Sequence, residues 1–438
     1  MEDQVTAQPD NLPGWLAYIE RQHAQPIALG LDRVREVSRR LGQRQTCPLI
    51  LVGGTNGKGS TCAMLERILL CAGYRVGLYT SPHLLAYNER VRIDGVAVED
   101  APLRAGFARV EAARIDGNDV PLTYFEFGTL AAWEVFAAQA LDVVILEVGL
   151  GGRLDATNIY EPDVAIVTSV DMDHMDYLGA TREAIGFEKA GIFRAGRPAI
   201  CGDADPPASL VEHCRTAGAD FLQIGRDFGY VRQEGQWQYW GSGGKRSGLA
   251  FPALRGAVQL GNAACVLAAL DTLREKLPVA MQEVRRGLLE VELPGRFQVL
   301  PGQPTLVLDV AHNPQAARVL ADSLGGMAFH PVTWAVFGML ADKDIPAVIE
   351  AIKHRVDVWL PCTLEGTRAA SADFLAQALE ASGCKVGGRF ATPAEALREA
   401  QARANEDDRI LAFGSFLTVA EVLRARAPKR MANGENFD

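Results

Sequence analysis

The sequence predicts an α/β protein with two domains, each built around a mainly parallel sheet. Apolar strand-like runs alternate with helical patterns through most of the 438 residues, which is typical of parallel α/β layering. Residues 292–297 place a proline and a glycine between a helical pattern and a new strand, which indicates a domain boundary. We therefore expect an N-terminal domain over residues 1–293 and a smaller C-terminal domain over residues 294–438.

The expected strands and helices of the first domain follow from apolar runs bounded by turn residues. The segment at 226–254 differs, because aromatic residues mix with polar residues and glycines as in antiparallel hairpins. We expect it to be a structural appendage rather than a binding surface, and a helix at 260–273 follows it. The other strands are expected near residues 48–53, 75–79, 142–148, 164–168 and 197–201.

The second domain repeats the strand–helix alternation on a smaller scale. Strands are expected at 305–309, 333–338, 356–361 and 409–414, each followed by a helical pattern. The polar or small residues at their ends should line one edge of the sheet, where such folds bind ligands; these are Asp309, His312, Gly338 and Ser415. The residues from Ala427 are expected to fray.

Composition narrows the class of function. The formal net charge of −10 argues against a nucleic-acid partner, although a local basic pocket is compatible with it. The first residues lack a basic segment followed by an apolar core, and acidic residues interrupt the most apolar stretch, so we expect neither secretion nor a membrane span. The eight cysteines show no zinc spacing, and several are expected to be core thiols in a reducing cytoplasm.

The glycine-rich run at 53–60 is the most informative motif. An apolar strand leads into Gly-Gly-Thr-Asn-Gly-Lys-Gly-Ser and then into an amphipathic helix. Such a turn directs backbone N–H groups inward at a helix N-terminus, and Lys58 adds a point charge for phosphates. The spacing departs from the standard phosphate-loop pattern, since Gly59 separates Lys58 from Ser60. A plain glycine turn with a solvated lysine is the alternative, but nucleoside triphosphate binding is favoured.

Three further motifs contain candidate metal-binding or hydroxyl groups. Glu147 ends a buried-strand pattern, where phosphate-loop enzymes place a magnesium-binding acid; an exposed strand end is the alternative. Ser81 follows another strand and could reach the phosphate loop, or it could merely precede a proline turn. His174 stands among three aspartates, and this spacing fits a metal ligand and a structural histidine equally well.

Two other segments favour structural roles when they are judged by their residues alone. Lys189 lies near the end of a short helical pattern capped by Gly191, where a lysine is normally solvated and complements the helix dipole. The aromatic cluster at 123–127 could stack on a flat heterocycle, but such clusters ordinarily belong to the core. The glycines at 149–152 favour function, because they permit close approach of a ligand.

Taken together, these motifs resemble the bacterial bifunctional dihydrofolate synthase/folylpolyglutamate synthases, a branch of the Mur ligase superfamily. The resemblance extends from about residue 29 to 415, and its most specific part is the stretch at 146–158. The motifs occur in the order Gly-Thr-Asn-Gly-Lys-Gly-Ser, Thr-Ser-Pro-His-Leu, Thr-Tyr-Phe-Glu-Phe-Gly-Thr, Leu-Glu-Val-Gly-Leu-Gly-Gly-Arg-Leu-Asp-Ala-Thr-Asn, Glu-Lys-Ala-Gly-Ile, Leu-Pro-Gly-Arg and Asp-Val-Ala-His-Asn-Pro. The fold implied is an N-terminal P-loop ATPase domain with a parallel sheet and a smaller C-terminal Rossmann-like domain.

The resemblance also implies a role for particular residues. ATP would be bound by Gly57, Lys58, Gly59, Ser60, Asn262, Arg296 and Asp309. Magnesium would be bound by Ser81, Glu147, His174 and Lys189, the last as a carbamate, which replaces the solvated role expected above. The pterin or folate would contact Gly30, Leu31, Leu122, Thr123, Tyr124, Phe125, Leu154, Asp155 and Ala156. His312 and Ser415 are candidates for binding glutamate, and Lys58, His174, Lys189 and Arg296 would act in catalysis.

The activity implied is an ATP-dependent ligase that joins L-glutamate to dihydropteroate and to folates through an acyl phosphate. Two magnesium ions would assist, with a monovalent cation as a further candidate, in a cytoplasmic monomer. Two positions depart from the pattern. Ala28 replaces an acidic residue at the edge of the pterin pocket, and Leu417 replaces a histidine near the glutamate site.

Two other functions fit these motifs less well. A muramyl-peptide ligase would need a further substrate domain, but only about fifty residues precede the phosphate loop. A nucleotide-hydrolysing switch without ligase chemistry would not need the second α/β domain. Both are disfavoured.

Overall fold

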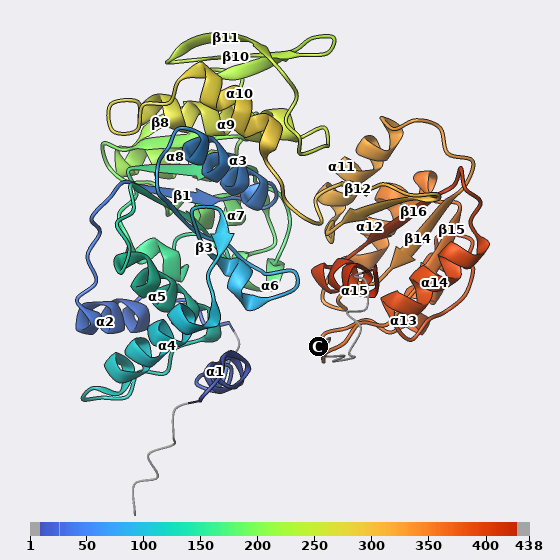
Figure 1. Ribbon diagram of the computed structural model, residues 1–438, viewed down its shortest axis with the longest axis horizontal. Coiled ribbons are helices and arrows are strands. Elements are labelled where there is room, and N and C mark those ends of the chain that lie inside the picture. Colours follow the sequence, from blue (N-terminus) through green and yellow to red (C-terminus); the bar gives the residue numbers. More distant parts are fainter. Residues whose placement is uncertain (1–8, 26, 427–438) are drawn as a thin grey trace, which may run out of the picture. The chain divides into compact units, whose positions relative to one another are not determined.

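The computed structural model describes residues 9–25 and 27–426, and the segment from Ala427 that we expect to fray lies outside them. The chain divides into two compact units, Met1–Leu293 and Pro294–Asp438. Figure 1 shows the elements of both, coloured along the sequence.

The first unit is organised around an eight-stranded sheet in the order β4-β3-β2-β5-β1-β6-β7-β8. Six of the strands are parallel, whereas β3 and β4 pair antiparallel at one edge, so the predicted parallel sheet is mixed there. The strands are β1 (Leu49–Gly53), β2 (Val76–Tyr79), β3 (Val91–Ile93), β4 (Val96–Ala97), β5 (Val143–Glu147), β6 (Val164–Val167), β7 (Pro198–Cys201) and β8 (Asp220–Gln223).

Helices cover both faces of this sheet because its central strands are apolar on both sides. In β1, Leu49 and Leu51 join one buried cluster, and Ile50 and Val52 join the other. The helical elements are α1 (Leu12–Ile19), α2 (Asp32–Leu41), α3 (Lys58–Cys71), η1 (Tyr87–Arg90), α4 (Asp100–Ile115), α5 (Tyr124–Ala137), η2 (Ala156–Ile159), α6 (Met175–Leu178), α7 (Arg182–Ala190), α8 (Ala208–Ala217), α9 (Gln259–Thr272) and α10 (Met281–Glu290).

The aromatic segment at 226–254 forms a separate antiparallel sheet, as predicted. Its strands are β9 (Gly229–Arg232), β10 (Trp237–Gly241) and β11 (Gly244–Leu249), in the order β11-β10-β9. Trp237 and Tyr239 are fully buried in the same cluster as α9, and the Tyr239 hydroxyl donates to Asp271 of that helix at 2.8 Å. These contacts fasten the small sheet to α9.

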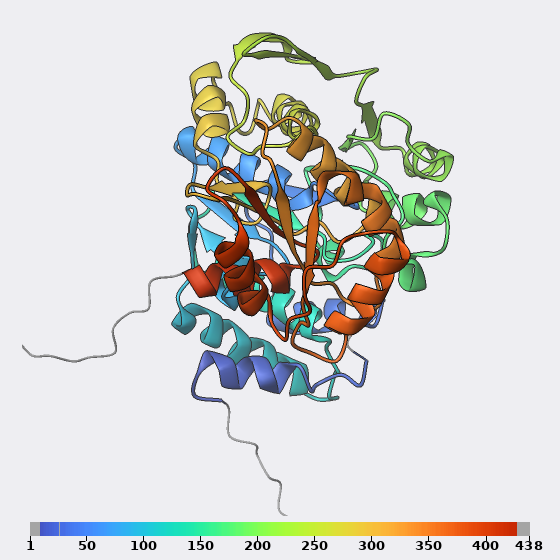
Figure 2. The same ribbon diagram turned by 90° about the vertical axis from the view of Figure 1, so that its right-hand side faces the viewer.

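The second unit contains a five-stranded sheet in the order β12-β13-β16-β14-β15, with helices on both of its faces (Figure 2). Only its edge strand β12 is antiparallel. The strands are β12 (Gln298–Leu300), β13 (Thr305–Asp309), β14 (Thr333–Phe337), β15 (Val358–Pro361) and β16 (Arg409–Phe413). The helical elements are α11 (Pro314–Gly325), α12 (Ile345–Ile352), η3 (Lys353–Arg355), α13 (Ala372–Ala381), α14 (Pro393–Arg403) and α15 (Phe416–Arg426).

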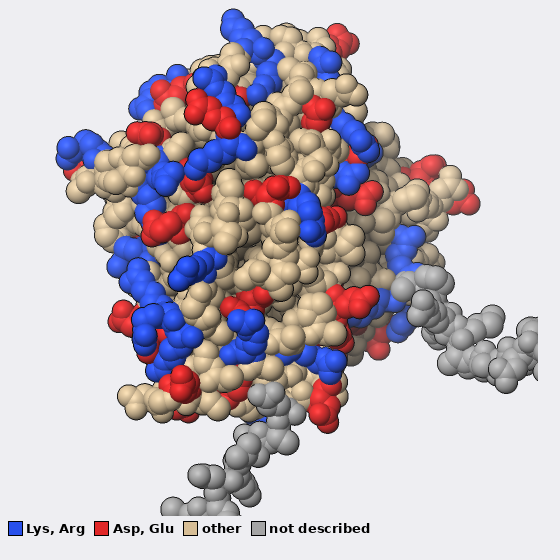
Figure 3. Space-filling view, turned by 60° about the vertical axis from the view of Figure 1, so that its left-hand side comes forward, with Lys and Arg blue, Asp and Glu red and all other residues tan. Residues whose placement is uncertain are grey.

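The predicted fold class is therefore confirmed. Among the described residues, no helix combines the length and the apolar character that crossing a membrane requires. The face displayed in Figure 3 intersperses lysine and arginine with aspartate and glutamate, so it mixes both signs of charge.

Candidate functional site

The carboxyl ends of four neighbouring parallel strands define the candidate site of the first unit. In the order β2-β5-β1-β6, these strands run in the same direction, so the loops that follow them emerge at one edge of the sheet. The chain passes from β5 on one side of β1 to β6 on the other. Open α/β sheets bind ligands at the carboxyl ends of strands at such a point. The four loops contain Lys58, Ser81, Glu147 and His174.

The loop after β1 has a backbone that requires glycine. Gly54 and Gly57 have φ angles of +140° and +89°. A Cβ atom on Gly54 would stand 1.9 Å from Thr168 Oγ1, and one on Gly57 would stand 2.6 Å from Asn262 Oδ1. The loop therefore packs closely against β6 and α9, and it brings Asn262 to the start of α3, as the assignment of both to one ligand requires.

Lys58 is the first residue of α3, and its side chain folds back over the loop. Its Nζ donates to the carbonyl oxygens of Gly54 at 3.0 Å and Thr55 at 3.3 Å. The amine is thus held beside the backbone turn rather than extended into solvent. A helix N-terminus, a glycine turn and a retained cation are together suited to an anion such as a triphosphate.

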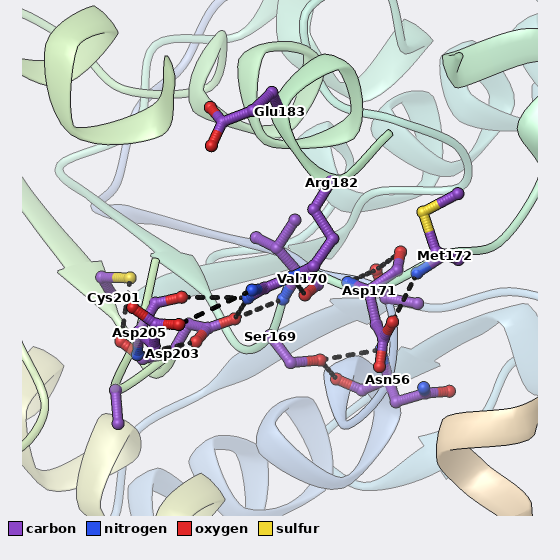
Figure 4. Close-up of polar contacts among 12 residues, drawn as sticks. Asn56, Ser169, Val170, Asp171, Met172, Arg182, Glu183, Cys201, Asp203 and Asp205 are labelled. Atoms are coloured by element: carbon purple, nitrogen blue, oxygen red, sulfur yellow. Dashed lines mark hydrogen bonds and ion pairs between the residues drawn. The ribbon is translucent and has the colours of Figure 1, made fainter. Parts of the chain in front are cut away.

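The loop is clamped to the segment that follows β6, as Figure 4 shows. The amide of Thr55 donates to the Ser169 carbonyl at 2.8 Å, and the Asn56 amide donates to Ser169 Oγ at 3.1 Å. Thr55 Oγ1 donates to the Asp171 carbonyl and accepts from the Asp171 amide, both at 3.0 Å. The segment that leads to His174 is therefore fixed in position beside the phosphate loop. The sequence alone did not indicate this connection.

A second set of contacts holds this segment from its other side (Figure 4). Arg182, the first residue of α7, donates to the Val170 carbonyl at 3.0 Å and pairs with Asp203 Oδ2 at 3.1 Å. The Val170 amide donates to the same carboxylate oxygen at 3.0 Å. Arg182 and Asp203 thus connect α7, β7 and the His174 segment.

Ser81 and Glu147 lie together, as expected of ligands to one metal ion. The Ser81 amide donates to Glu147 Oε2 at 3.2 Å, across the neighbouring ends of β2 and β5. Glu147 is only 4% exposed, so the alternative of an exposed strand end is wrong. A buried carboxylate and a serine residue at adjacent strand ends supply oxygen atoms of the kind that Mg²⁺ prefers.

His174 precedes α6 in a left-handed conformation, with φ of +51°. Its amide donates to Asp173 Oδ1 at 2.9 Å, and its Nε2 lies 3.9 Å from Asp173 Oδ2. Among the described residues, no group of three or more His, Cys, Asp or Glu side chains is arranged to hold a metal ion. The candidate ligands Ser81, Glu147, His174 and Lys189 include only two residues of those four types.

Lys189 is buried, which contradicts its expectation as a solvated residue at a helix end. It lies in the last turn of α7 and is 3% exposed. Burial lowers the pKa of Lys189 to about 7, and the positive charge of Lys58 contributes to the lowering, whereas Asp173 and Asp155 oppose it. These influences show that Lys189 shares the electrostatic environment of the phosphate loop and the His174 segment.

The glycines at 149–152 allow helix and side-chain atoms to pack closely against the loop that follows β5. A Cβ atom on Gly149 would stand 2.5 Å from the Phe125 ring, and one on Gly152 would stand 2.8 Å from the Glu188 carbonyl oxygen. The neighbours of these glycines are thus protein atoms. Close packing against Glu188 places the end of α7, with Lys189, beside the loop that follows β5.

The candidate pterin segments meet around the N-terminus of α5. Arg33 Nη2 pairs with Glu126 Oε1 at 3.0 Å and also donates to the Ala28 carbonyl at 2.6 Å, which ties residues 28–33 to α5. Thr123 and Glu126 form a reciprocal capping box. Of the candidate contacts, Gly30, Tyr124, Phe125 and Leu154 are partly exposed, whereas Leu31, Leu122, Thr123, Asp155 and Ala156 are buried.

Asp155 is a structural centre of the loop after β5. Its carboxylate accepts from the Leu150 amide at 2.8 Å and from the Thr157 amide at 3.0 Å. Burial raises the pKa of Asp155, although these hydrogen bonds lower it. This buried carboxylate therefore shapes the loop that presents Leu154.

The second unit gathers its own predicted residues at the ends of β13 and β16, which pair in parallel. The Asp309 carboxylate accepts from the amides of Phe297 at 2.8 Å and Ala311 at 2.7 Å. Burial raises the pKa of Asp309, and the nearby Arg296 opposes this. The Arg296 guanidinium lies 4.8 Å from the centre of the Phe416 ring, which also lies 6.3 Å from that of His312.

Comparison with known proteins identifies the class of this fold and site. Residues 52–269 match the Mur ligase middle domain, and residues 295–416 match the Mur ligase glutamate ligase domain. The chain is thus built as a Mur ligase.

Full-length relatives define the branch. The dihydrofolate synthase/folylpolyglutamate synthase of Escherichia coli (strain K12) is 44% identical over 420 residues, which span 96% of each chain. A structure of E. coli FolC in complex with DHPP and ADP has a TM-score of 0.89 at 43% identity, covering 95% of this chain and 98% of that one. The Yersinia pestis bifunctional enzyme complexed with AMPPNP and Mn ion has a TM-score of 0.88 at 46% identity, covering 95% and 98%.

The chain belongs to the bifunctional dihydrofolate synthase/folylpolyglutamate synthase family, and it is a ligase. The resemblance seen in the sequence motifs is confirmed.

Proposed function

We propose that this ligase uses ATP to join the amine of L-glutamate to the carboxylate of dihydropteroate, and likewise to the carboxylate of folates. The observation that supports this most directly is the convergence, at one sheet edge, of an anion-binding loop, a buried carboxylate and a buried lysine of lowered pKa. Structures of relatives contain ADP, AMPPNP, DHPP, Mn and L-glutamate.

Residues of both units are proposed to bind ATP. Gly57, Lys58, Gly59 and Ser60 bind the phosphates, through backbone N–H groups, the ammonium and the hydroxyl. Asn262 fits this group because it lies against Gly57. Arg296 and Asp309 of the second unit contribute to ATP binding, the arginine as a counter-charge for phosphate.

Ser81, Glu147, His174 and Lys189 are proposed to hold divalent metal, two Mg²⁺ ions in all. The Ser81–Glu147 contact and the burial of the carboxylate fit such a site. Bound Mg²⁺ would neutralise charge that develops on the phosphates.

Lys189 fits a carbamate because carbamate formation requires a neutral amine. The neutral Nζ attacks CO₂, forming a C–N bond and releasing one proton, and the product is an anionic oxygen ligand. A lysine of ordinary pKa would be almost wholly protonated at pH 7, whereas burial lowers the pKa of Lys189 to about 7.

In the proposed reaction, the substrate carboxylate attacks the γ-phosphorus of ATP, and ADP leaves. The neutral glutamate amine then attacks the carbonyl carbon of the acyl phosphate. The C–O bond to phosphate breaks, phosphate departs, and the nitrogen loses one proton as the amide forms. Lys58 and Arg296 stabilise negative charge during the first step. The partly exposed Tyr124, Phe125 and Leu154, with Gly30, are proposed to contact the pterin, and Leu31, Leu122, Thr123, Asp155 and Ala156 to shape its pocket.

The remaining proposals concern the residues that bind the glutamate substrate and the cellular location of the enzyme. His312 and Ser415 are proposed to orient glutamate. We place the enzyme in the cytoplasm, since all eight cysteines are free thiols. We also propose that it acts as a monomer. A monovalent cation is proposed as a further cofactor of the enzyme.

The test is a turnover assay with purified protein, Mg²⁺, ATP, dihydropteroate and L-glutamate. Equal amounts of ADP and dihydrofolate are expected, and omission of either dihydropteroate or L-glutamate should abolish the formation of both products. ADP release at the same rate with and without dihydropteroate and glutamate would support a nucleotide-hydrolysing switch instead.

A further inference from the structure

Gln259 is a buried polar residue between the first turns of two helices. It is the first residue of α9 and is 6% exposed. Its Nε2 donates to Ser60 Oγ at 3.3 Å, and its Oε1 accepts from Asn262 Nδ2 at 3.0 Å. Ser60 and Asn262 are themselves 2% and 7% exposed. One carboxamide thus joins the start of α3 to the start of α9.

The direction of these hydrogen bonds constrains both neighbours. Because Ser60 Oγ accepts from Gln259, the hydroxyl hydrogen remains available to donate to an anion. Because Asn262 directs its Nδ2 toward Gln259, its Oδ1 is the atom that faces Gly57. Gln259 therefore sets the orientation of a hydroxyl and an amide that both border the phosphate loop.

We propose that Gln259 is a positioning residue for nucleotide binding, which acts by orienting the Ser60 hydroxyl and the Asn262 amide. This inference rests on the proposed function, in which Ser60 and Asn262 bind ATP. Since Gln259 is buried behind these side chains, its effect should fall on ATP affinity rather than on the chemical step.

Two substitutions separate positioning from packing. Gln259→Leu keeps much of the side-chain volume but leaves Ser60 and Asn262 without their shared partner, so the KM for ATP should rise about tenfold with kcat within about twofold. Gln259→Glu keeps the acceptor for Asn262 but presents a second acceptor to Ser60. The serine hydrogen then turns toward the glutamate, and the added negative charge opposes phosphate. A larger rise in the KM for ATP is expected, even if the leucine variant folds poorly.

The matched control is Gln238→Leu. Gln238 also donates to a serine hydroxyl, that of Ser247 at 3.0 Å, but on the exposed face of the β10–β11 hairpin. Its substitution should leave the KM for ATP unchanged. Thermal unfolding of all variants checks that the fold is retained.

A Ser60→Ala background tests the route. If Gln259 acts through Ser60, Gln259→Leu should raise the KM for ATP by a smaller factor there than in the wild type; an equal factor would overturn the proposal. So would a KM within about twofold of wild type for folded Gln259→Glu. Wild-type protein that fails to release ADP with dihydropteroate and glutamate would instead count against the proposed function, so the two failures are distinguishable.

Discussion

Lys189 offers the sharpest prediction, because its burial couples protonation to folding. Its pKa falls from 10.5 to about 7 in the folded protein, chiefly through burial. The folded chain therefore releases this proton near pH 7, whereas the unfolded chain retains it up to about pH 10.5. The lysine's effect on the free energy of unfolding thus becomes more unfavourable as pH falls from about 10.5 to 7, and is constant below that.

The magnitude follows from the shift. One pKa unit corresponds to about 1.4 kcal/mol, so between pH 9.5 and 7 the wild type should lose roughly 3 kcal/mol relative to a variant without the amine. Lys189→Met supplies that variant, with a side chain of similar length and no charge. Urea unfolding in CO₂-free buffer should show the stability advantage of Lys189→Met growing by this amount as pH is lowered. The same variant should lose ligase turnover on the order of 100-fold.

Lys245→Met is the control, since Lys245 lies exposed on β11. It should show neither the pH-dependent stability gain nor the loss of turnover. A Lys189→Met stability difference that does not vary between pH 7 and 9.5 would refute the buried neutral amine. Near-normal turnover of the variant would refute the carbamate role.

Two further substitutions test other parts of the site. Glu147→Gln keeps an acceptor for the Ser81 amide but removes the charge, so the Mg²⁺ concentration for half-maximal turnover should rise roughly 10- to 100-fold; an unchanged value would contradict metal binding by Glu147. Arg33→Lys removes the paired contact with Glu126, so the KM for dihydropteroate should rise roughly three- to tenfold while the KM for ATP stays constant. Arg39→Lys, which alters an exposed pair with Glu36 on the same helix, is its control, and equal effects of the two would argue against a role in the pterin pocket.

Local pattern was sufficient to predict most of the fold. The strand at 305–309 is found at those residues, and the other predicted strands begin or end within about two residues of their predicted limits. Continuous apolar runs predict these strands well, because the central strands of a parallel sheet are buried on both faces. The antiparallel edges formed by β3, β4 and β12 were not predicted, since strand direction depends on how the chain returns to the sheet.

The connections within the site could not be predicted, because they join residues far apart in sequence. Gln259 and Ser60 are separated by 199 positions, and Arg33 and Glu126 by 93. A glutamine at the start of a helix looks like any solvated residue until its neighbours are known. Lys189 shows the same limit, because its position at a helix end favours exposure, whereas it is buried in a helix that packs against the loop after β5.

Helix α7 explains why Lys189 and the segment that leads to His174 depend on each other. Its first residue, Arg182, holds the backbone at Val170, on the segment that leads to His174. Its last turn presents Lys189, whose pKa responds to Lys58 and Asp173. A rigid helix nine residues long thus fixes the spacing between the two ends. Displacement of Arg182 would shift the His174 segment and reduce the burial that keeps Lys189 neutral, so these residues at the sheet edge depend on one another.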